Sequence, residues 1–210
     1  MHGPERLLAG RRLFIFDLDG TLADSSPIHA AAFATVLAPR GIAVDYPAIA
    51  GMATAPAMRH LLALAGQQPD DAELAALVAA KRAAARQALV GLREIAGAGA
   101  FVACAARHHR LALCTSAARV TADATLAVLG LADRFETIVT ADDVAKPKPD
   151  AEAFLAVLDR AGVAAADALI FEDSEAGLAA AHAAGIDAIR IGEGAADWPR
   201  LTLLLDGAAA

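Results

Sequence analysis

The sequence predicts an α/β protein in which a parallel β-sheet is flanked by helices and interrupted by one all-helical insertion. Three observations lead to this fold. An apolar run at residues 13–16 leads straight into acidic residues, which is typical of a buried strand. Beyond residue 110, short apolar runs alternate with helical segments of roughly ten residues, the pattern of a parallel sheet. Between residues 26 and 96, only helical periodicity occurs.

The alternating part of the chain predicts four strands and the helices between them. Gly130, Gly162 and Gly185 each follow a helical run, as expected where a helix ends in a left-handed residue. Because a parallel sheet needs several strands, the strand at residues 13–16 is expected to join this set. The other expected strands are residues 111–114, 137–140, 168–171 and 188–191, and the expected helices are residues 120–129, 150–161 and 175–184.

The strand-free stretch predicts a separate helical domain inserted into the sheet domain. One helix is expected after Ser26, a second from Thr54 to Gly66, and a third after Asp70, whose partner Glu73 completes a capping box. The expected core domain comprises residues 1–24 and 98–210, and the expected cap domain comprises residues 25–97. Residues 97–99 (GAG) are interpreted as a loop or hinge. Two adjacent crossings between the domains suit a lid.

Composition excludes several classes of protein. The chain has 210 residues, 57% of them hydrophobic, and a net charge of −7, so it lacks the basic surface that binds nucleic acid. No apolar run approaches the roughly 18 to 20 residues of a membrane span. Cys104 and Cys114 lie in apolar stretches, which favours buried thiols over a disulfide. A cytoplasmic, monomeric protein without nucleic-acid or membrane partners is expected.

Two pairs of acidic residues follow two of the expected strands. Asp17 and Asp19 come after the first strand, and Glu172 and Asp173 follow the strand at residues 168–171. Carboxylates at buried strand ends repel each other and resist burial unless a cation compensates them. A hard divalent metal ion with oxygen ligands is therefore expected.

Gly20 follows Asp19 and allows the backbone to turn tightly and approach a ligand closely. The nearest alternative is an EF-hand calcium loop, which needs glycine at its sixth position and an acid at its twelfth. Here a strand precedes the acids and the glycine comes too early, so the EF-hand is disfavoured.

Two further segments could bind a phosphate group. Thr115 and Ser116 follow the strand at residues 111–114, and their hydroxyls either bind a phosphate oxygen or cap a helix. Lys146 and Lys148 lie in a proline-stiffened loop, and either lysine could neutralise a phosphate, or both could face solvent.

Taken in order, these motifs resemble those of the haloacid dehalogenase-like hydrolase superfamily. The matching segments are residues 17–21 (DLDGT), Thr115, residues 146–150 (KPKPD) and residues 172–177 (EDSEAG). The resemblance implies a Rossmann-like parallel sheet core, and the insertion resembles that superfamily's helical cap. His29, twelve residues after Asp17, adds similarity to the phosphoglucomutase and sugar-phosphatase branch.

The resemblance also implies roles for the acids. Asp17 would attack phosphorus and form an aspartyl-phosphate, and Asp19 would protonate the leaving alcohol and then activate water. A Mg²⁺ ion would be held by Asp17, by the backbone carbonyl of Asp19, and by Glu172 and Asp173. The substrate would be a small phosphorylated metabolite.

Phosphate binding is implied for the remaining motif residues. These are Gly20, Thr21, Thr115, Ser116 and Lys146. Lys146 is preferred over Lys148 because the superfamily pattern is K-P-x-P. Asp24 and Ser25 would lie at the hinge, and His29 would either tie the lid to the core or be an ordinary helix residue.

Phosphatase activity is preferred over a β-phosphoglucomutase-like mutase activity. Mutases of this superfamily carry a cap arginine where residues 51–54 read GMAT, and three consecutive basic residues where only Lys81 and Arg82 stand. A dehalogenase would lack Asp19, and a non-catalytic binding protein is disfavoured because all the acids are present. Specificity is assigned to the cap without fixing the residues, although Arg59 and Lys81 are expected to face solvent. The other cap candidates are Met52, Thr54, Met58 and Arg82.

Overall fold

The computed structural model describes residues 4–192 and 197–208 and contains a five-stranded parallel sheet. The strand order is β3-β2-β1-β4-β5. The strands are β1 (Leu13–Phe16), β2 (Arg110–Cys114), β3 (Thr137–Val139), β4 (Ala168–Glu172) and β5 (Asp187–Arg190). The predicted α/β fold is confirmed, and the first strand of the chain lies in the middle of the sheet.

The central strand is apolar because both of its faces are covered. All four residues of β1 are buried, and their side chains alternate between two clusters. Phe14 and Phe16 face one cluster, and Leu13 and Ile15 face the other. The sheet is therefore the middle layer of three, which explains the continuous apolar run in the sequence.

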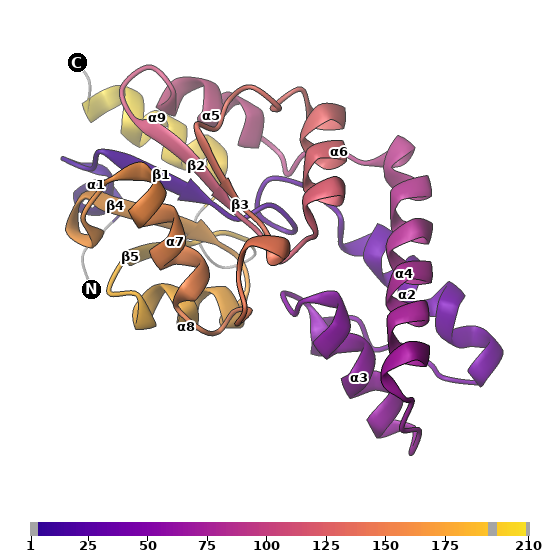
Figure 1. Ribbon diagram of the computed structural model, residues 1–210. Coiled ribbons are helices and arrows are strands. Elements are labelled where there is room, and N and C mark those ends of the chain that lie inside the picture. Colours follow the sequence, from indigo (N-terminus) through magenta and orange to yellow (C-terminus); the bar gives the residue numbers. More distant parts are fainter. Residues whose placement is uncertain (1–3, 193–196, 209–210) are drawn as a thin grey trace.

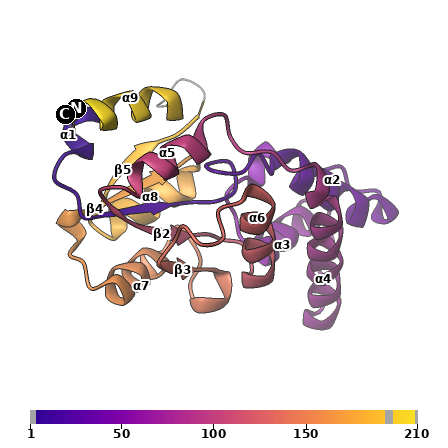
Figure 2. The ribbon, with the colours of Figure 1, turned by 90° about the horizontal axis from the view of Figure 1, so that it is seen from above.

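Helices form the two outer layers (Figures 1 and 2). Phe16 packs with Phe101 of α5 and Trp198 of α9 on one face, whereas Phe154 of α7 lies in the cluster on the other face, beside α8. The helices of this part of the chain are α1 (Pro4–Leu8), α5 (Ala98–Ala105), α6 (Arg119–Leu129), α7 (Glu152–Ala161), α8 (Glu175–Ala183) and α9 (Trp198–Ala208).

Three helices stand apart from the sheet, on the side where its strands end (Figure 1). They are α2 (Ser26–Leu37), α3 (Thr54–Leu64) and α4 (Asp71–Gln87). Their buried residues form a hydrophobic cluster of their own, which includes Phe33, Met58 and Leu62. Asp70 caps α4 by accepting a hydrogen bond from the amide of Glu73, but the Glu73 side chain contacts Arg40 and does not complete the predicted capping box. We call residues 25–97 the helical block.

The two crossings between the helical block and the sheet lie side by side. The amide of Asp24 donates to the carbonyl of Arg93 at 2.9 Å, and the amide of Ile95 donates to the carbonyl of Leu22 at 2.8 Å. The loop expected at residues 97–99 is shorter in the structure. Gly97 lies in a turn with a φ of +86°, and Ala98 and Gly99 already belong to α5.

Two smaller expectations concern the cysteines and the membrane. Cys104 and Cys114 are buried and free, as predicted. Within residues 4–192 and 197–208, no helix has the length and apolar character required to span a bilayer.

Candidate active site

The acidic residues meet because β1 and β4 are neighbours in register. Phe16 pairs with Phe171, and the amide of Asp17 donates to the carbonyl of Phe171 at 3.0 Å. The strands end together, so the following acids emerge at one edge of the sheet. One carboxylate oxygen from each of Asp17, Glu172 and Asp173 lies within 4.8 Å of the other two. The structure thus brings together three of the four predicted metal ligands through their side chains.

Lys148 is the cation of this cluster. Its Nζ donates to Asp17 Oδ1 at 2.7 Å, to Glu172 Oε2 at 2.8 Å and to the backbone carbonyl of Cys114 at 3.1 Å. Its side chain is 3% exposed, so these charge-assisted hydrogen bonds are shielded from water. The ammonium also lies 5.0 Å from the centre of the Phe154 ring.

The preference for Lys146 over Lys148 is therefore corrected. The side chain of Lys146 is 72% exposed and lies 3.8 Å from Asp150 on the surface. The cause is Glu152 at the start of α7, which accepts hydrogen bonds from the amides of Ala145 and Lys146 and holds that part of the loop outside. Both lysines precede a proline, so local sequence does not separate them.

Electrostatics at Asp17 favour a bound cation. Burial raises the pKa of Asp17 well above its usual value, and the charge of Glu172 raises it further, against the opposing effect of Lys148. Burial and Glu172 likewise raise the pKa of Asp173 to about 6. One ammonium cannot compensate three carboxylates, whereas a divalent ion would favour the ionised form of each. The donor set fits Mg²⁺, which prefers carboxylate oxygens.

Asp19 faces away from this cluster, toward the helical block. Its Oδ1 accepts a hydrogen bond from Ser25 Oγ at 2.6 Å and lies 3.0 Å from Nε2 of His29 on α2. Burial alone would raise the pKa of Asp19, but His29, Ser25 and the charge of Lys81 lower it to about 2. Ligation of a metal by the backbone carbonyl of Asp19 stays a prediction.

Lys81 of α4 extends this chain of contacts. Its Nζ lies 3.0 Å from Nδ1 of His29 and 4.6 Å from the centre of the Phe33 ring. The expectation that Lys81 faces solvent is wrong, because the residue is 4% exposed. Burial lowers the pKa of Lys81 to about 8, against the opposing effect of Asp19 and with a further lowering by Arg82. The His29 ring therefore connects Lys81 to Asp19 through its two nitrogens.

Gly20 and Thr21 hold Asp173. Thr21 is fully buried, and its hydroxyl donates to Asp173 Oδ1 at 3.1 Å. Gly20 has a φ of +87°, and a Cβ there would collide with the Asp173 carboxylate. Neither residue lines the pocket described below, and substrate binding by them stays a prediction.

Ser174, in the loop after β4, makes two side-chain hydrogen bonds. Ser174 caps α8 by accepting from the amide of Gly177, and its hydroxyl also donates to Glu172 Oε1 at 2.8 Å. The cap therefore orients the carboxylate that binds Lys148.

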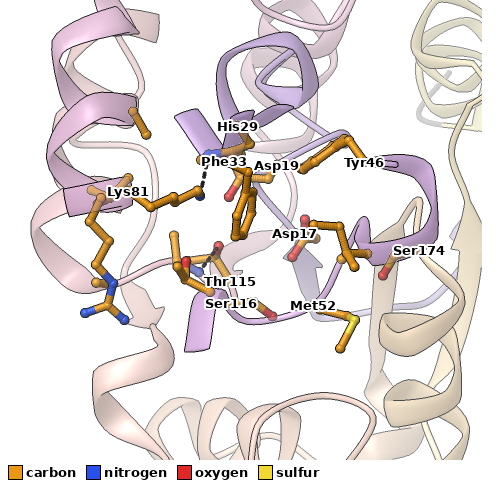
Figure 3. Close-up of a pocket in the computed structure, with 18 of the residues that line it drawn as sticks. Asp17, Asp19, His29, Phe33, Tyr46, Met52, Lys81, Thr115, Ser116 and Ser174 are labelled. Carbon is orange, nitrogen blue, oxygen red and sulfur yellow. Dashed lines mark hydrogen bonds and ion pairs between the residues drawn. The ribbon is translucent and has the colours of Figure 1, made fainter. Parts of the chain in front are cut away.

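A pocket between the sheet edge and the helical block is lined by the acids Asp17, Asp19 and Glu172 among others (Figure 3). Thr115 and Ser116 also line it, and phosphate binding by them stays a prediction. Thr115 does not cap a helix, because α6 starts after Ala118, and its Oγ1 accepts from the amide of Ala117 at 3.0 Å. Pocket residues that sequence reasoning missed are Phe33, Tyr46 and Ile49.

The cap candidates divide into two groups. Met52, Thr54, Lys81 and Arg82 line the pocket. Met58 is fully buried in the cluster of the helical block, and Arg59 is exposed beside Asp71. Helical periodicity indicates which residues share a face, but only the packing of α4 on α2 decides which face meets the site.

The helical block touches the site directly at Gly51. This residue has a φ of +79°, and a Cβ there would lie 2.5 Å from the Cβ of Ser174. Such a distance is too short for two carbons, so glycine is required for this approach.

Comparison with known proteins identifies the class. The family model described as haloacid dehalogenase-like hydrolase matches residues 14–191. Fructose-1-phosphate phosphatase YqaB of Escherichia coli is 33% identical over 177 residues, covering 84% of this chain and 94% of that protein. Phosphoglycolate phosphatase of Rhodospirillum rubrum is 36% identical over 199 residues, covering 90% and 83%.

A solved structure of a similar protein has the same fold. The crystal structure of a hydrolase from Pseudomonas syringae has a TM-score of 0.80 and 26% identity, covering 92% of this chain and 90% of that one. The chain belongs to the haloacid dehalogenase-like hydrolase family, and the expectation of a phosphatase is confirmed.

Proposed function

We propose that this protein is a Mg²⁺-dependent phosphatase that hydrolyses a small phosphorylated metabolite through an aspartyl-phosphate on Asp17. The observation that carries the proposal is the placement of Asp17 beside Lys148, Glu172 and Asp173. Phosphoryl transfer depends mostly on positioning and on charge stabilisation, and this cluster offers both. The names of the phosphatase relatives support a sugar phosphate or a phosphoglycolate-like ester as substrate.

Asp17, Glu172 and Asp173 would hold the metal ion, which would supply positive charge to the transferring phosphoryl group and to the nucleophile. Lys148 adds a fixed positive charge to the same carboxylates. Thr115 and Ser116 line the pocket at the neighbouring strand end, where their hydroxyls can donate to phosphate oxygens.

The reaction has two steps. A carboxylate oxygen of Asp17 attacks phosphorus, the bond to the ester oxygen breaks, and Asp19 gives a proton to the departing alcohol. Asp19 then takes a proton from water, whose oxygen attacks phosphorus and frees Asp17 together with inorganic phosphate. Ser25 and His29 hold the Asp19 carboxylate in place for both proton transfers.

We propose that the helical block acts as a lid over this chemistry. Its two adjacent crossings form a hinge, and its contact with Ser174 through Gly51 excludes water from the site. Ser25 and His29 of the helical block both contact the Asp19 carboxylate, so these contacts depend on the lid being closed.

The test is phosphate release from 4-nitrophenyl phosphate with Mg²⁺, with EDTA in its place, and with Asp17→Asn. We expect turnover only in the first case, because the other two lack the cation or the nucleophile. Equal rates in all three would refute the proposal. Conversion of a hexose 1-phosphate with catalytic bisphosphate into hexose 6-phosphate would show a mutase instead.

A further inference from the structure

Arg82 has a polar atom that the protein itself does not satisfy. Among the residues that the structure describes, its Nε is the one buried side-chain nitrogen or oxygen without a hydrogen-bond partner. Buried polar groups are nearly always paired, so an orphaned guanidinium nitrogen at a pocket points to a missing ligand. Arg82 lines the same pocket as Asp17 and Asp19.

No carboxylate of the described pocket lining is left over for Arg82. The acids that line the pocket are Asp17, Asp19 and Glu172. Asp17 and Glu172 both bind Lys148, and Asp19 binds His29. The positive charge of Arg82 is therefore available to something that enters the pocket.

Arg82 shares the pocket lining with small and hydroxyl-bearing side chains. They are Ala85 of α4, Ser116, Ala118 and Thr121. A substrate whose phosphate lies at Asp17 would extend its leaving group into this part of the pocket.

We propose that Arg82 determines substrate specificity by binding an anionic oxygen group, a carboxylate or a second phosphate, on the leaving group of the ester. This assignment rests on the phosphatase activity proposed above and names the class of substrate that the site selects. A guanidinium binds carboxylate or phosphate with two parallel hydrogen bonds, and Nε is one of the donors in that arrangement.

The experiment compares esters that differ only in the far group. Phosphoglycolate is paired with 2-hydroxyethyl phosphate, and propane-1,3-diol bisphosphate is paired with 3-hydroxypropyl phosphate. For at least one pair, we expect the wild-type kcat/KM of the charged member to exceed that of the neutral member by about tenfold or more. A preference in the first pair identifies a carboxylate, and one in the second pair identifies a second phosphate.

Variants then assign the preference to Arg82. Arg82→Met should reduce the charged-to-neutral ratio to about one, and Arg82→Lys should keep part of it, because lysine retains the charge without the planar fork. A general loosening of the helical block would lower kcat/KM equally for both members of a pair and leave the ratio of the two values unchanged. Arg59→Met is the matched control, because Arg59 is an exposed arginine of the same block. Circular dichroism checks folding, and Arg82→Gln replaces the methionine variant if that variant does not fold.

Two results would overturn the assignment: a wild-type ratio near one in both pairs, or a preference that survives Arg82→Met. Hydrolysis of 4-nitrophenyl phosphate separates the two proposals. If the wild type hydrolyses this ester without preferring a charged partner, only the role of Arg82 fails. If it hydrolyses none of the esters, the proposed phosphatase function fails.

Discussion

The ammonium of Lys148 lies 2.7 Å from the carboxylate of Asp17, although 131 positions separate the two residues in the chain. The loop that carries Lys148 follows β3, and its ammonium passes the end of β2, where it binds the carbonyl of Cys114, to reach the neighbouring strand β1. The contact ties the proposed nucleophile to the fixed positive charge of the site.

Lys148→Met should lower kcat/KM for 4-nitrophenyl phosphate by about 100-fold or more, because the carboxylates and the transferring phosphoryl group lose their fixed cation. Lys146→Met is the matched control and should stay within about twofold, since Lys146 is exposed. The measurement is phosphate release with circular dichroism as a folding check. A larger effect at Lys146 would contradict the observed geometry.

Asp19→Asn should separate the two chemical steps. Nitrophenolate leaves without a proton, so 4-nitrophenyl phosphate should still give a rapid burst of one equivalent per enzyme. Turnover should then be slow, because no base activates water. An alkyl phosphate should give no burst. Stopped-flow absorbance measures the nitrophenolate burst, and phosphate release measures the turnover. Asp24→Asn, at an exposed acid nearby, should behave as the wild type. Absence of a burst with the aryl ester would count against Asp19 as the acid and base.

Lys81→Met should lower the activity and raise the stability of the protein. The folded pKa of Lys81 is about 8, below its value of 10.5 in a free side chain. Between these values the unfolded chain binds more protons than the folded one, so stability rises with pH across that window. The variant should lose this rise and should gain stability near pH 7 of order 1 kcal/mol.

Urea denaturation at pH 7 and pH 10 measures how the free energy of unfolding changes with pH. Lys146→Met should show the same change with pH as the wild type. The activity of Lys81→Met should fall about tenfold or more, because His29 loses the contact that holds its ring against Asp19. An unchanged pH slope would show that Lys81 is not buried in solution.

Gly51→Ala should weaken the closed state of the lid. Its methyl group would lie 2.5 Å from the Cβ of Ser174, so the helical block would have to move away from the site. We expect kcat/KM to fall about tenfold. Gly41→Ala is the control: Gly41 has a φ of +69° but no atom within 4 Å of an added Cβ, so that variant should lose stability alone. Steady-state kinetics and thermal melts separate the two effects, and equal kinetics in both variants would argue against closure at Gly51.

The strands, the helix ends and the acidic pairs could be predicted from the sequence alone. Continuous apolar runs predicted buried strands, glycines predicted helix ends, and the acids after residues 16 and 171 predicted a cluster at one sheet edge. These features depend on local periodicity and on the common direction of parallel strands, which a linear pattern records.

Only the tertiary structure decided which of several similar side chains enter the site. Lys148 replaces Lys146 because Glu152 binds the loop backbone, and Lys81 turns inward because α4 packs on α2. The orphaned nitrogen of Arg82 likewise follows from that packing. Such choices depend on contacts between segments far apart in the chain, and the energies of those contacts are not written in either segment alone.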